Sequence, residues 1–458
     1  MFPLDFTKRL RDQHYVDAET LLTALKEPSP VSIRTNPAKW NRIPVESTSV
    51  PWCSTGWYLG GRPSYTLDPL YHAGCYYPQE ASGMFLEAAF NQIFPGSGKI
   101  KVLDLCGAPG GKSTHLSSLI GDRGFLVANE VIRSRASVLA ESITKWGASN
   151  TIVTSNDPSS FASLTNYFDL MVIDAPCSGE GMFRDRVALE EWSVSNAAMC
   201  SDRQKRILMN VWPSLKQGGI LIYSTCTFNP AENEENIKWL TGKVAAESIR
   251  LNTGTCSGIE EISFKGITGY GFYPGKIKGE GFFLSCLRKL ESSAGELFKK
   301  KRSESPVVLS NVRLASEMIK TSDDNLYRHN DTILRLSLPK EELLYLKNCL
   351  LIIKAGTAVF KARDRDISPL HELAMSCQIN DATFQVCELD YRDALSFLRK
   401  ENLNLKNRQK GWILVRYLGM NLGFAKNIGT RINNYYPVEW RIRVTDPSHS
   451  DERPVIWK

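Results

Sequence analysis

The sequence has few of the features that mark secreted, membrane-spanning or metal-stabilised proteins. Its 458 residues include eleven Cys but no Cys-x-x-Cys pair, and only six His, so neither a disulfide framework nor a metal site is indicated. No apolar run approaches the roughly 18 residues that a bilayer crossing needs, and the N-terminal MFPLDFTKRLRDQH lacks the apolar core of a signal peptide. We therefore expect a soluble cytoplasmic protein in which an exposed Cys is a reduced thiol and a candidate nucleophile.

The net charge is small but unevenly distributed. The 56 Lys and Arg exceed the 49 Asp and Glu by only seven, whereas segment 399–443 alone has ten Lys or Arg against two Glu. Short strand-like runs, Gly breaks and aromatic residues in this segment predict a small β-rich module with a basic surface for nucleic acid. A merely solvated charged face would give the same count.

The middle of the chain has the pattern of a parallel β-sheet. Apolar runs bounded by turn residues alternate with helical stretches, and they occupy residues 100–105, 124–130, 151–155, 168–174 and 218–227. Such runs are typical of strands buried on both faces, with helices as crossovers. We predict a doubly wound, Rossmann-like α/β sheet within residues 96–290, with an added edge strand at 281–289.

The flanking regions predict further domains, in keeping with two to four domains for this length. Residues 1–95 combine an amphipathic stretch, a Pro-rich break and loop-rich segments, which indicates an N-terminal α+β arm. The polar stretch 291–306 is predicted to be a linker, 307–395 an α+β intermediate domain, and 396–458 the basic β-rich module.

A glycine-rich loop follows the first predicted strand of the sheet. It contains Cys106, Gly107, Ala108, Pro109, Gly110, Gly111 and Lys112, and a helix follows. A nucleotide P-loop would need one more residue before its Gly-Lys-Ser, and the dinucleotide pattern G-x-G-x-x-G is absent. Glu130, at the end of the second run, suits ribose hydroxyls, and Asp157 suits an adenine edge. Together they indicate S-adenosylmethionine; a tight turn and ordinary surface acids are the alternative, strongest for Asp157.

Two cysteines stand at the predicted carboxyl ends of strands. Cys177 follows Asp174-Ala175-Pro176, and Cys226 follows Ser224-Thr225. Open α/β sheets bind ligands at this edge, so both thiols would face one crevice, although either could be a small buried hydrophobe. A thiol beside a methyl donor suits methylation of pyrimidine carbon 5, because thiolate addition at carbon 6 activates carbon 5. Asp174 could share a proton with the N3 and exocyclic amine of cytosine. These residues alone leave the two cysteine roles interchangeable.

The motifs together resemble the Sun-type family of RNA cytosine-5 methyltransferases. The resemblance covers about the first 290 residues and is carried by the segments 32–36, 76–82, 107–112, 174–179 and 224–227. It implies that Cys226 is the nucleophile, that Cys177 assists product release, and that residues 106–112, Glu130, Asp157 and Asp174 contact the methyl donor. It also implies that residues 96–290 are the methyltransferase core and that the arm binds RNA.

The substrate implied by the resemblance is structured RNA. Lys278-Gly279-Glu280-Gly281-Phe282-Phe283 and the basic tail with Asn433-Asn434-Tyr435-Tyr436-Pro437 look like the subfamily that acts on small-subunit ribosomal RNA and has a PUA-like RNA-binding module. We expect a monomer that acts on this RNA or on the 30S subunit. Transfer RNA as substrate, a ribosome-assembly factor without catalysis, and a DNA or protein methyltransferase are the alternatives. Trp52, Trp57 and Tyr58 are expected to stack on RNA or to pack between domains.

Overall fold

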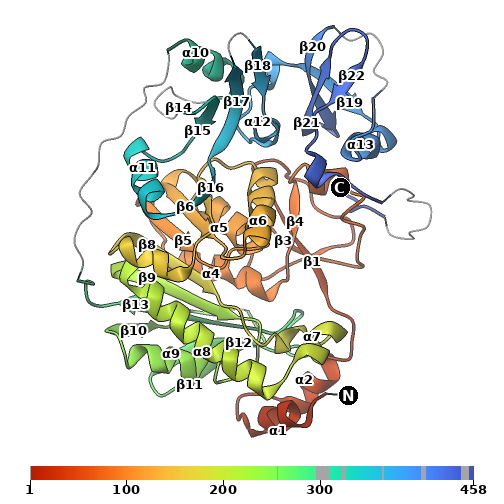
Figure 1. The fold of residues 1–458 in the computed structure, drawn as a ribbon. Helices are drawn as coiled ribbons and strands as arrows, with labels where there is room; N and C mark the ends of the chain where they lie inside the picture. Colours follow the sequence, from red (N-terminus) through yellow and green to blue (C-terminus); the bar gives the residue numbers. More distant parts are fainter. Residues whose placement is uncertain are drawn as a thin grey trace.

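The computed structural model describes residues 2–254, 256–294, 309–320, 326–363, 366–403, 409–444 and 453–458 (Figure 1). A large central sheet and a small N-terminal sheet form the middle and lower parts of the view, and two further sheets from the C-terminal third lie above them. None of the described helices is long and apolar enough to cross a membrane.

The predicted parallel strands form the centre of the large sheet. They are β5 (Ile100–Asp104), β6 (Gly124–Asn129), β7 (Thr151–Thr154), β8 (Phe168–Asp174) and β9 (Leu215–Thr225), in the spatial order β9-β8-β5-β6-β7. The chain reverses its direction of winding between β5 and β8, and in such sheets the carboxyl ends on either side of this point border the ligand crevice. The Rossmann-like fold predicted from the apolar runs is confirmed.

Apolar side chains on both faces of this sheet bury the crossover helices. One face packs mainly against α8 (Val194–Val211), α9 (Glu234–Thr241) and the turn η3 (Pro158–Ser163). The other face packs against α4 (Leu86–Ile93), α5 (Gly111–Ile120) and α6 (Arg133–Trp146). Burial on both faces explains why the strands are nearly continuous apolar runs rather than alternating ones. The short η4 (Glu180–Met182), α7 (Arg186–Glu191), η2 (Gly121–Arg123) and η5 (Trp212–Ser214) complete the connections.

Antiparallel strands extend the sheet beyond β9. They are β10 (Ala246–Ile249), β11 (Ile259–Phe264), β12 (Ile267–Phe272) and β13 (Phe282–Lys289). The prediction that residues 281–289 form an edge strand is wrong, because β13 lies between β9 and β12 and also pairs with β10. Its almost wholly buried side chains fit this interior place, which depends on pairing with β9 and β12 on its two sides.

The opposite edge of the large sheet is completed from the C-terminal third. Strand β16 (Ile352–Ala355) pairs antiparallel with β7, and α11 (Lys340–Cys349) packs into the adjoining core through Leu343 and Leu346. The large sheet therefore includes residues from the region that we expected to form a separate intermediate domain.

Before α4, the described part of the N-terminal region contributes three α-helices, one short 3-10 helix and a small four-stranded sheet. Its elements are α1 (Leu4–Asp12), α2 (Ala18–Ala24), β1 (Val31–Thr35), β2 (Thr48–Ser49), β3 (Gly56–Leu59), α3 (Pro69–His72), β4 (Tyr76–Pro78) and η1 (Ser82–Phe85). Helices α1 and α2 pack against Phe183, Phe228 and Tyr273, three aromatic residues of the core domain. The arm is thus packed firmly against the core.

Two four-stranded sheets follow in the C-terminal third. The first has β14 (Leu326–His329), β15 (Thr332–Arg335), β17 (Thr357–Arg363) and β18 (Asp366–Pro369), with α10 (Leu309–Met318) and α12 (His371–Met375). The second has β19 (Gln385–Leu389), β20 (Gly411–Tyr417), β21 (Met420–Asn427) and β22 (Ile432–Asn434), with η7 (Asp381–Thr383), α13 (Tyr391–Leu398) and η8 (Val438–Trp440).

The second sheet begins earlier in the chain than residue 396, where we expected the basic module to start, because β19 pairs in parallel with β20. Its helix α13 packs on the N-terminal region in a cluster that includes Ile33, Leu70 and Phe397. Most of the predicted linker 291–306, and Lys406 and Arg408 of the basic segment, lie outside the described residues.

Candidate active site

The two predicted thiols lie side by side at the carboxyl edge of the sheet. Strand β8 ends at Asp174 and the neighbouring β9 at Thr225, so the loops that follow them leave the sheet together. Cys177 Sγ and Cys226 Sγ are 3.1 Å apart and form a hydrogen bond in which either thiol can be the donor. Ser224 Oγ donates to Asp174 Oδ1 at 2.8 Å and ties the two strand ends together.

The two sulfur atoms have different surroundings. The hydrogen bond with Cys226 and burial together raise the pKa of Cys177 well above its usual range. Cys177 is therefore a protonated thiol at neutral pH. Cys226 lies on the more open side, with Met182 Sδ 4.0 Å from its Sγ.

The glycine-rich loop turns sharply into α5 beside these thiols. Gly110 has φ +120 and precedes the helix, and a Cβ added to it would stand 2.6 Å from Cβ of Ser142 on α6. Only glycine combines this backbone conformation with so close an approach. Gly107 donates its N–H to Asn129 O at 2.7 Å, which fixes the loop against the end of β6.

The side chain of Lys112 points away from the glycine-rich loop and towards the end of β8. Its Nζ donates to Asp174 Oδ2 at 2.8 Å. Burial opposes the charge of Lys112, but the Asp174 carboxylate outweighs this effect, and the pKa of Lys112 is raised. Lys112 is thus a paired cation between the loop and the end of β8, which differs from the phosphate-binding role of a P-loop lysine.

Two cavities meet at these residues. The Glu130 cavity, of about 450 Å³, runs between the ends of β6 and β8 and is lined by Glu130, Ile132, Asp157, Pro158 and Ile207, among others. The Gln79 cavity, of about 420 Å³, lies on the other side and is lined by Gln79, Glu80, Lys112, Arg184 and Phe282, among others. The lining residues common to both are Cys106, Ala108, Asp174, Met182 and Cys226.

The predicted cofactor residues divide between the two cavities. Cys106, Ala108, Glu130, Asp157 and Asp174 line the Glu130 cavity, whereas Gly107, Pro109, Gly111 and Lys112 line the Gln79 cavity. Gly110 instead stands at the start of α5. Burial raises the pKa of Cys106 well above its usual range, so this third thiol of the site also keeps its proton.

The two acidic residues proposed for the nucleoside are held differently. Glu130 is 4% exposed, and its Oε1 accepts the Ile132 N–H at 3.0 Å. Asp157 is exposed and caps η3, since its Oδ1 accepts from Ser159 N–H at 2.9 Å and from Ser159 Oγ at 2.6 Å. These bonds lower the pKa of Asp157. Glu130 has contacts of its own, because Arg135 Nη2 also lies 3.6 Å from its Oε2, but it is buried in the cavity wall whereas Asp157 is exposed.

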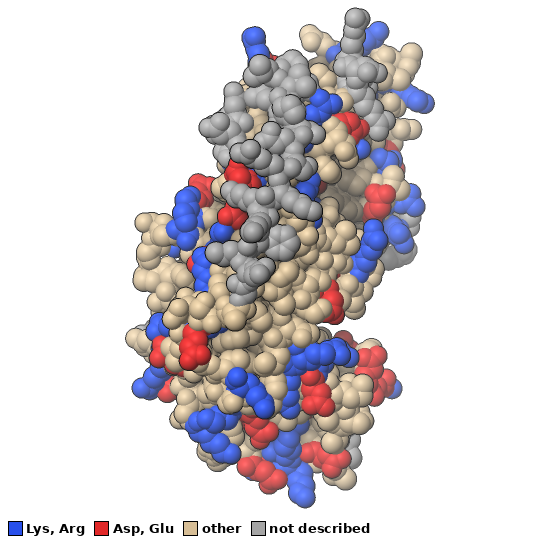
Figure 2. Space-filling view, turned by 60° about the vertical axis from the view of Figure 1, so that its left-hand side comes forward, with Lys and Arg blue, Asp and Glu red and all other residues tan. Residues whose placement is uncertain are grey.

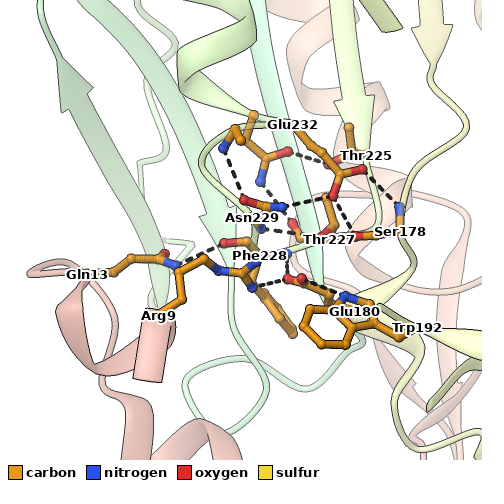
Figure 3. A network of polar contacts seen from close by, with 12 residues as sticks. Arg9, Gln13, Ser178, Glu180, Trp192, Thr225, Thr227, Phe228, Asn229 and Glu232 are labelled. Carbon is orange, nitrogen blue, oxygen red and sulfur yellow. Dashed lines mark hydrogen bonds and ion pairs between the residues drawn. The ribbon is translucent and has the colours of Figure 1, made fainter. Parts of the chain in front are cut away.

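Polar contacts behind the thiols fix the two cysteine loops to each other (Figure 3). Ser178 donates both its N–H and its Oγ–H to the buried carboxylate of Glu232, at 2.9 and 2.5 Å. Ser178 Oγ also lies 3.0 Å from Thr227 Oγ1, and Gln204 Nε2 donates to Glu232 Oε1 at 3.1 Å. These bonds hold the loop that carries Cys177 in a fixed position relative to the loop that carries Cys226.

The sequence did not single out several residues at this site. Met182, Arg184 and Glu280 line the Gln79 cavity, and Arg184 Nη1 donates to Glu280 Oε2 at 2.9 Å. Glu280 belongs to the Lys-Gly-Glu-Gly-Phe-Phe segment that supported the resemblance, so a signal was present for it. Arg184 and the buried Glu180 and Glu232 had none, because their roles depend on contacts between distant segments.

Two of the three aromatic residues that were expected to stack on RNA or to pack between domains do not present free faces to RNA. Trp52 is 6% exposed, donates Nε1–H to Ala81 O at 2.6 Å and packs against Phe85 and Phe272. Tyr58 is also buried, with Lys278 Nζ 4.6 Å from its ring centre. Stacking on RNA by Trp52 or Tyr58 is therefore excluded in this conformation, and both serve packing.

One buried set of donor atoms stands apart from the thiols. Cys53 Sγ, Glu87 and His115 Nε2 lie within 4.8 Å of one another. They also satisfy one another, because Glu87 Oε2 accepts from His115 at 2.9 Å and from Cys53 at 3.2 Å, and Glu87 Oε1 accepts from the Ser54 N–H. A hydrogen-bonded network explains this cluster, and we assign no metal to it.

Comparison with known proteins identifies the family. The sequence matches 16S rRNA methyltransferase RsmB/F over residues 94–288, the N-terminal domain of 16S rRNA methyltransferase RsmF over 2–81, and the methyltransferase RsmF PUA domain over 384–442. Ribosomal RNA small subunit methyltransferase F of Vibrio cholerae serotype O1 (strain M66-2) is 30% identical over 86% of this chain and 85% of its own length. The chain belongs to the ribosomal RNA small subunit methyltransferase F family.

Other relatives of the methyltransferase F family match over nearly the whole chain. The enzymes of that name from Aliivibrio salmonicida (strain LFI1238) and Enterobacter sp. (strain 638) are each 29% identical, over 93% and 96% of this chain and 94% and 95% of their own lengths. The predicted membership of an RNA methyltransferase family with a C-terminal PUA-like module is thus confirmed.

Solved structures support the same fold. A methyltransferase homolog protein from Pyrococcus horikoshii is 27% identical, with a TM-score of 0.53 over 63% of this chain and 96% of its own. NSun6 from the same organism, solved with SFG, is 20% identical, with a TM-score of 0.52 over 64% of this chain and 99% of its own. The second likeness concerns the fold alone.

Proposed function

We propose that this protein transfers a methyl group from S-adenosylmethionine to carbon 5 of a cytidine in small-subunit ribosomal RNA, with Cys226 as the nucleophile. The observation that carries the proposal is the position of Cys226, which lies where the two cavities join and 3.1 Å from a second thiol. A methyl donor in one cavity and a base in the other would meet at this sulfur. The names of the full-length relatives support RNA of the small subunit as the substrate.

The Glu130 cavity suits S-adenosylmethionine. Glu130 is a buried carboxylate at the end of β6 with capacity to accept from ribose hydroxyls, and Ile132, Pro158 and Ile207 give the cavity apolar surface for an adenine ring. The bound group supplies an electrophilic methyl on its sulfonium. Asp157, at the mouth of the same cavity, is the weaker candidate because Ser159 already occupies its Oδ1.

The Gln79 cavity would then receive the extruded base. Addition of Cys226 Sγ to carbon 6 of cytosine makes carbon 5 an enamine carbon, nucleophilic enough to take the methyl group. The release step breaks two bonds, the C–H bond at carbon 5 and the bond between Cys226 Sγ and carbon 6. Cys177, a protonated thiol beside the leaving sulfur, gives its proton to Cys226 Sγ, and the Cys177 thiolate formed in this way accepts the carbon-5 proton. The products are the methylated base and two protonated thiols, and Cys226 loses its proton to solvent before the next addition.

Asp174 and Lys112 form the wall that faces the base at this junction. Asp174 accepts from Lys112 and Ser224, one bond at each carboxylate oxygen, so its orientation is fixed. Each oxygen has a further lone pair with which to accept from the exocyclic amine of cytosine. Uracil lacks this amine, so Asp174, held by Lys112, favours cytosine over uracil.

We extend the proposal to the setting of the reaction. The PUA-like module and the N-terminal arm would hold structured RNA, either free ribosomal RNA or the 30S subunit, and one chain contains the whole site, consistent with a monomer. The compartment is that of the ribosome, the cytoplasm.

The test is methyl transfer from tritiated S-adenosylmethionine to an unmodified small-subunit ribosomal RNA transcript and to 30S subunits. We expect label in RNA, with bisulfite sequencing locating it at cytidine, and we expect Cys226→Ala to reduce transfer to background. Label retained at the wild-type rate by Cys226→Ala would overturn the covalent mechanism, and label in no RNA would overturn the function. The same assay on transfer RNA tests the alternative substrate.

A further inference from the structure

We propose that the RNA strand next to the target nucleotide lies in a groove that leads from the Gln79 cavity across the N-terminal sheet to the loop between β3 and α3. This inference rests on the proposed function and adds to it the path of the substrate. We call this surface the Arg62 groove. It has a volume of about 1000 Å³ and is lined by residues 28–32, 59–62 and 78–80, with Tyr65, Lys278 and Glu280.

The groove continues the active-site cavity. Ser29, Pro78, Gln79, Glu80 and Glu280 line both the groove and the Gln79 cavity, which in turn reaches Cys226. A nucleotide inserted towards Cys226 would therefore leave its neighbour at the shared wall. RNA bases are read mostly in single-stranded segments whose nucleotides are unstacked, and one strand suits such a path.

The free charges of the groove are positive. The carboxylate of Glu80 accepts from the backbone N–H groups of Ser82, Gly83 and Glu280, and Glu280 is paired with Arg184. Arg62 and Lys278 are exposed, and neither forms an ion pair with a described residue. Backbone N–H groups thus already occupy the Glu80 carboxylate and Arg184 neutralises Glu280, while the two cations are available to phosphate groups.

The floor of the groove allows the phosphate backbone to come close. Gly60 and Gly61 are exposed, and a Cβ added to Gly61 would meet no atom within 4 Å. Lys278 is held above the Tyr58 ring at 4.6 Å, which limits the positions of its ammonium. Half-buried Tyr65, next to Arg62 in space, offers an aromatic edge for a base.

The far end of the groove leads to the C-terminal segment. The Ser64 N–H donates to Arg453 O at 3.1 Å, one residue before Tyr65. Arg453 belongs to the segment that follows the PUA-like module, and this segment adds a third cation at the end of the path. The groove therefore ends beside residues 453–458, which follow the PUA-like module in the sequence.

Charge reversal at two positions tests the groove. The double variant Arg62→Glu, Lys278→Glu is compared with Lys238→Glu, Lys243→Glu, which makes the same change of charge at two exposed positions on and just after α9. We expect the groove variant to bind a small-subunit ribosomal RNA transcript at least about tenfold more weakly, and the control to bind within twofold of wild type. The corresponding Ala pair should lower the slope of log K against log salt by about 1.4, or about 0.7 for each phosphate contact on a single strand.

Two further readouts separate this inference from a folding defect and from the proposed function. The groove variant should bind S-adenosylhomocysteine as wild type does and should methylate at nearly the wild-type rate when RNA is saturating. A photoreactive p-benzoylphenylalanine in place of Gly61 should crosslink within a few nucleotides of the methylated cytidine. Equal RNA binding by groove and control variants, or crosslinks only at distant nucleotides, would overturn the groove. Wild-type protein that methylates no RNA would instead overturn the proposed function.

Discussion

Arg9 in the first helix and Glu180 in the loop after β8 form an ion pair, with 2.6 Å between Arg9 Nη2 and Glu180 Oε2. Glu180 is fully buried, and its carboxylate also accepts from Trp192 Nε1 at 3.0 Å and from the Phe228 N–H at 3.2 Å. One carboxylate thus joins α1, the Cys177 loop and the loop after Cys226 (Figure 3). Gln13, the residue after α1, donates a further hydrogen bond from Nε2 to Phe228 O.

We predict that Arg9→Ala destabilises the protein by about 3 kcal/mol, the lower end of the range for breaking a buried ion pair, because Arg9 is 26% exposed. The variant leaves the Glu180 charge in the interior without its partner. Urea unfolding followed by tryptophan fluorescence measures the change. Arg11→Ala on the same helix is the control, since its pair with Glu19 is exposed and contributes less than about 1 kcal/mol. Equal losses in the two variants would contradict the prediction.

The Cys177→Ala variant is expected to accumulate a covalent complex with RNA. Addition at carbon 6 and methyl transfer need Cys226 alone, whereas release needs a proton-transfer group beside the sulfur, so turnover should fall by about 100-fold or more. A denaturing gel with labelled RNA would show the slowly migrating adduct. The double variant Cys177→Ala, Cys226→Ala should show none. A single Cys177→Ala variant that turns over normally and leaves no adduct would assign release to another group.

Glu130→Gln is expected to weaken S-adenosylmethionine binding by about tenfold or more, the loss that follows when a buried charged acceptor for ribose hydroxyls becomes neutral. The matched variant Asp157→Asn should lose less than about threefold, because Asn still caps η3 and the carboxylate is exposed. Isothermal titration calorimetry with S-adenosylmethionine compares them. Unchanged affinity in Glu130→Gln, or a greater loss in Asp157→Asn, would reassign the ribose contact.

We predict that the ring of His371, on α12, makes the protein less stable at acidic pH. Burial lowers its pKa to about 3, and Lys145, Lys39 and Lys400 add to the effect. Neither ring nitrogen has a hydrogen-bond partner among the described residues. The unfolded chain, with an ordinary pKa near 6.5, binds a proton that the folded chain does not, so the free energy of unfolding decreases as pH falls below about 6.5.

The replacement His371→Leu removes this contribution. We expect the variant to lose less stability than wild type between pH 7.5 and pH 5, by about 1 to 2 kcal/mol, at up to about 1.4 kcal/mol per pH unit below 6.5. Urea unfolding at the two pH values measures the difference. Parallel curves for His371→Leu and wild type would contradict the assignment.

Local sequence predicted the parallel strands and their helices closely. The run 168–174 is β8 over the same residues, and the run 124–130 contains β6 over residues 124–129, because apolar runs and Gly breaks act within a few positions. The order of the strands was not predicted. The pairing of β13 with β9 and of β16 with β7 joins segments more than 50 residues apart in sequence, and periodicity does not encode such pairings.

The residues of the candidate site also fall into two groups, those that the sequence could predict and those that it could not. Cys177, Cys226, Asp174 and the glycine-rich loop could be proposed because each follows a recognisable strand. Glu180 and Glu232 could not, since a buried carboxylate acquires its role from partners such as Arg9 and Ser178 on other elements. The sequence also could not distinguish the two thiols. Their different surroundings, with Cys177 protonated and enclosed, arise only when the two loops meet.

Because strand β16 pairs with β7, the large sheet cannot be completed before the C-terminal third of the chain has been made. Because residues 352–355 cover the edge of β7, a chain that ends near residue 290 would leave the N–H and C=O groups of β7 open to pairing with other chains. A fragment limited to the core is therefore expected to aggregate. During synthesis, the catalytic sheet remains unfinished until residue 355 has left the ribosome, so a polypeptide that lacks its C-terminal third has no complete catalytic sheet.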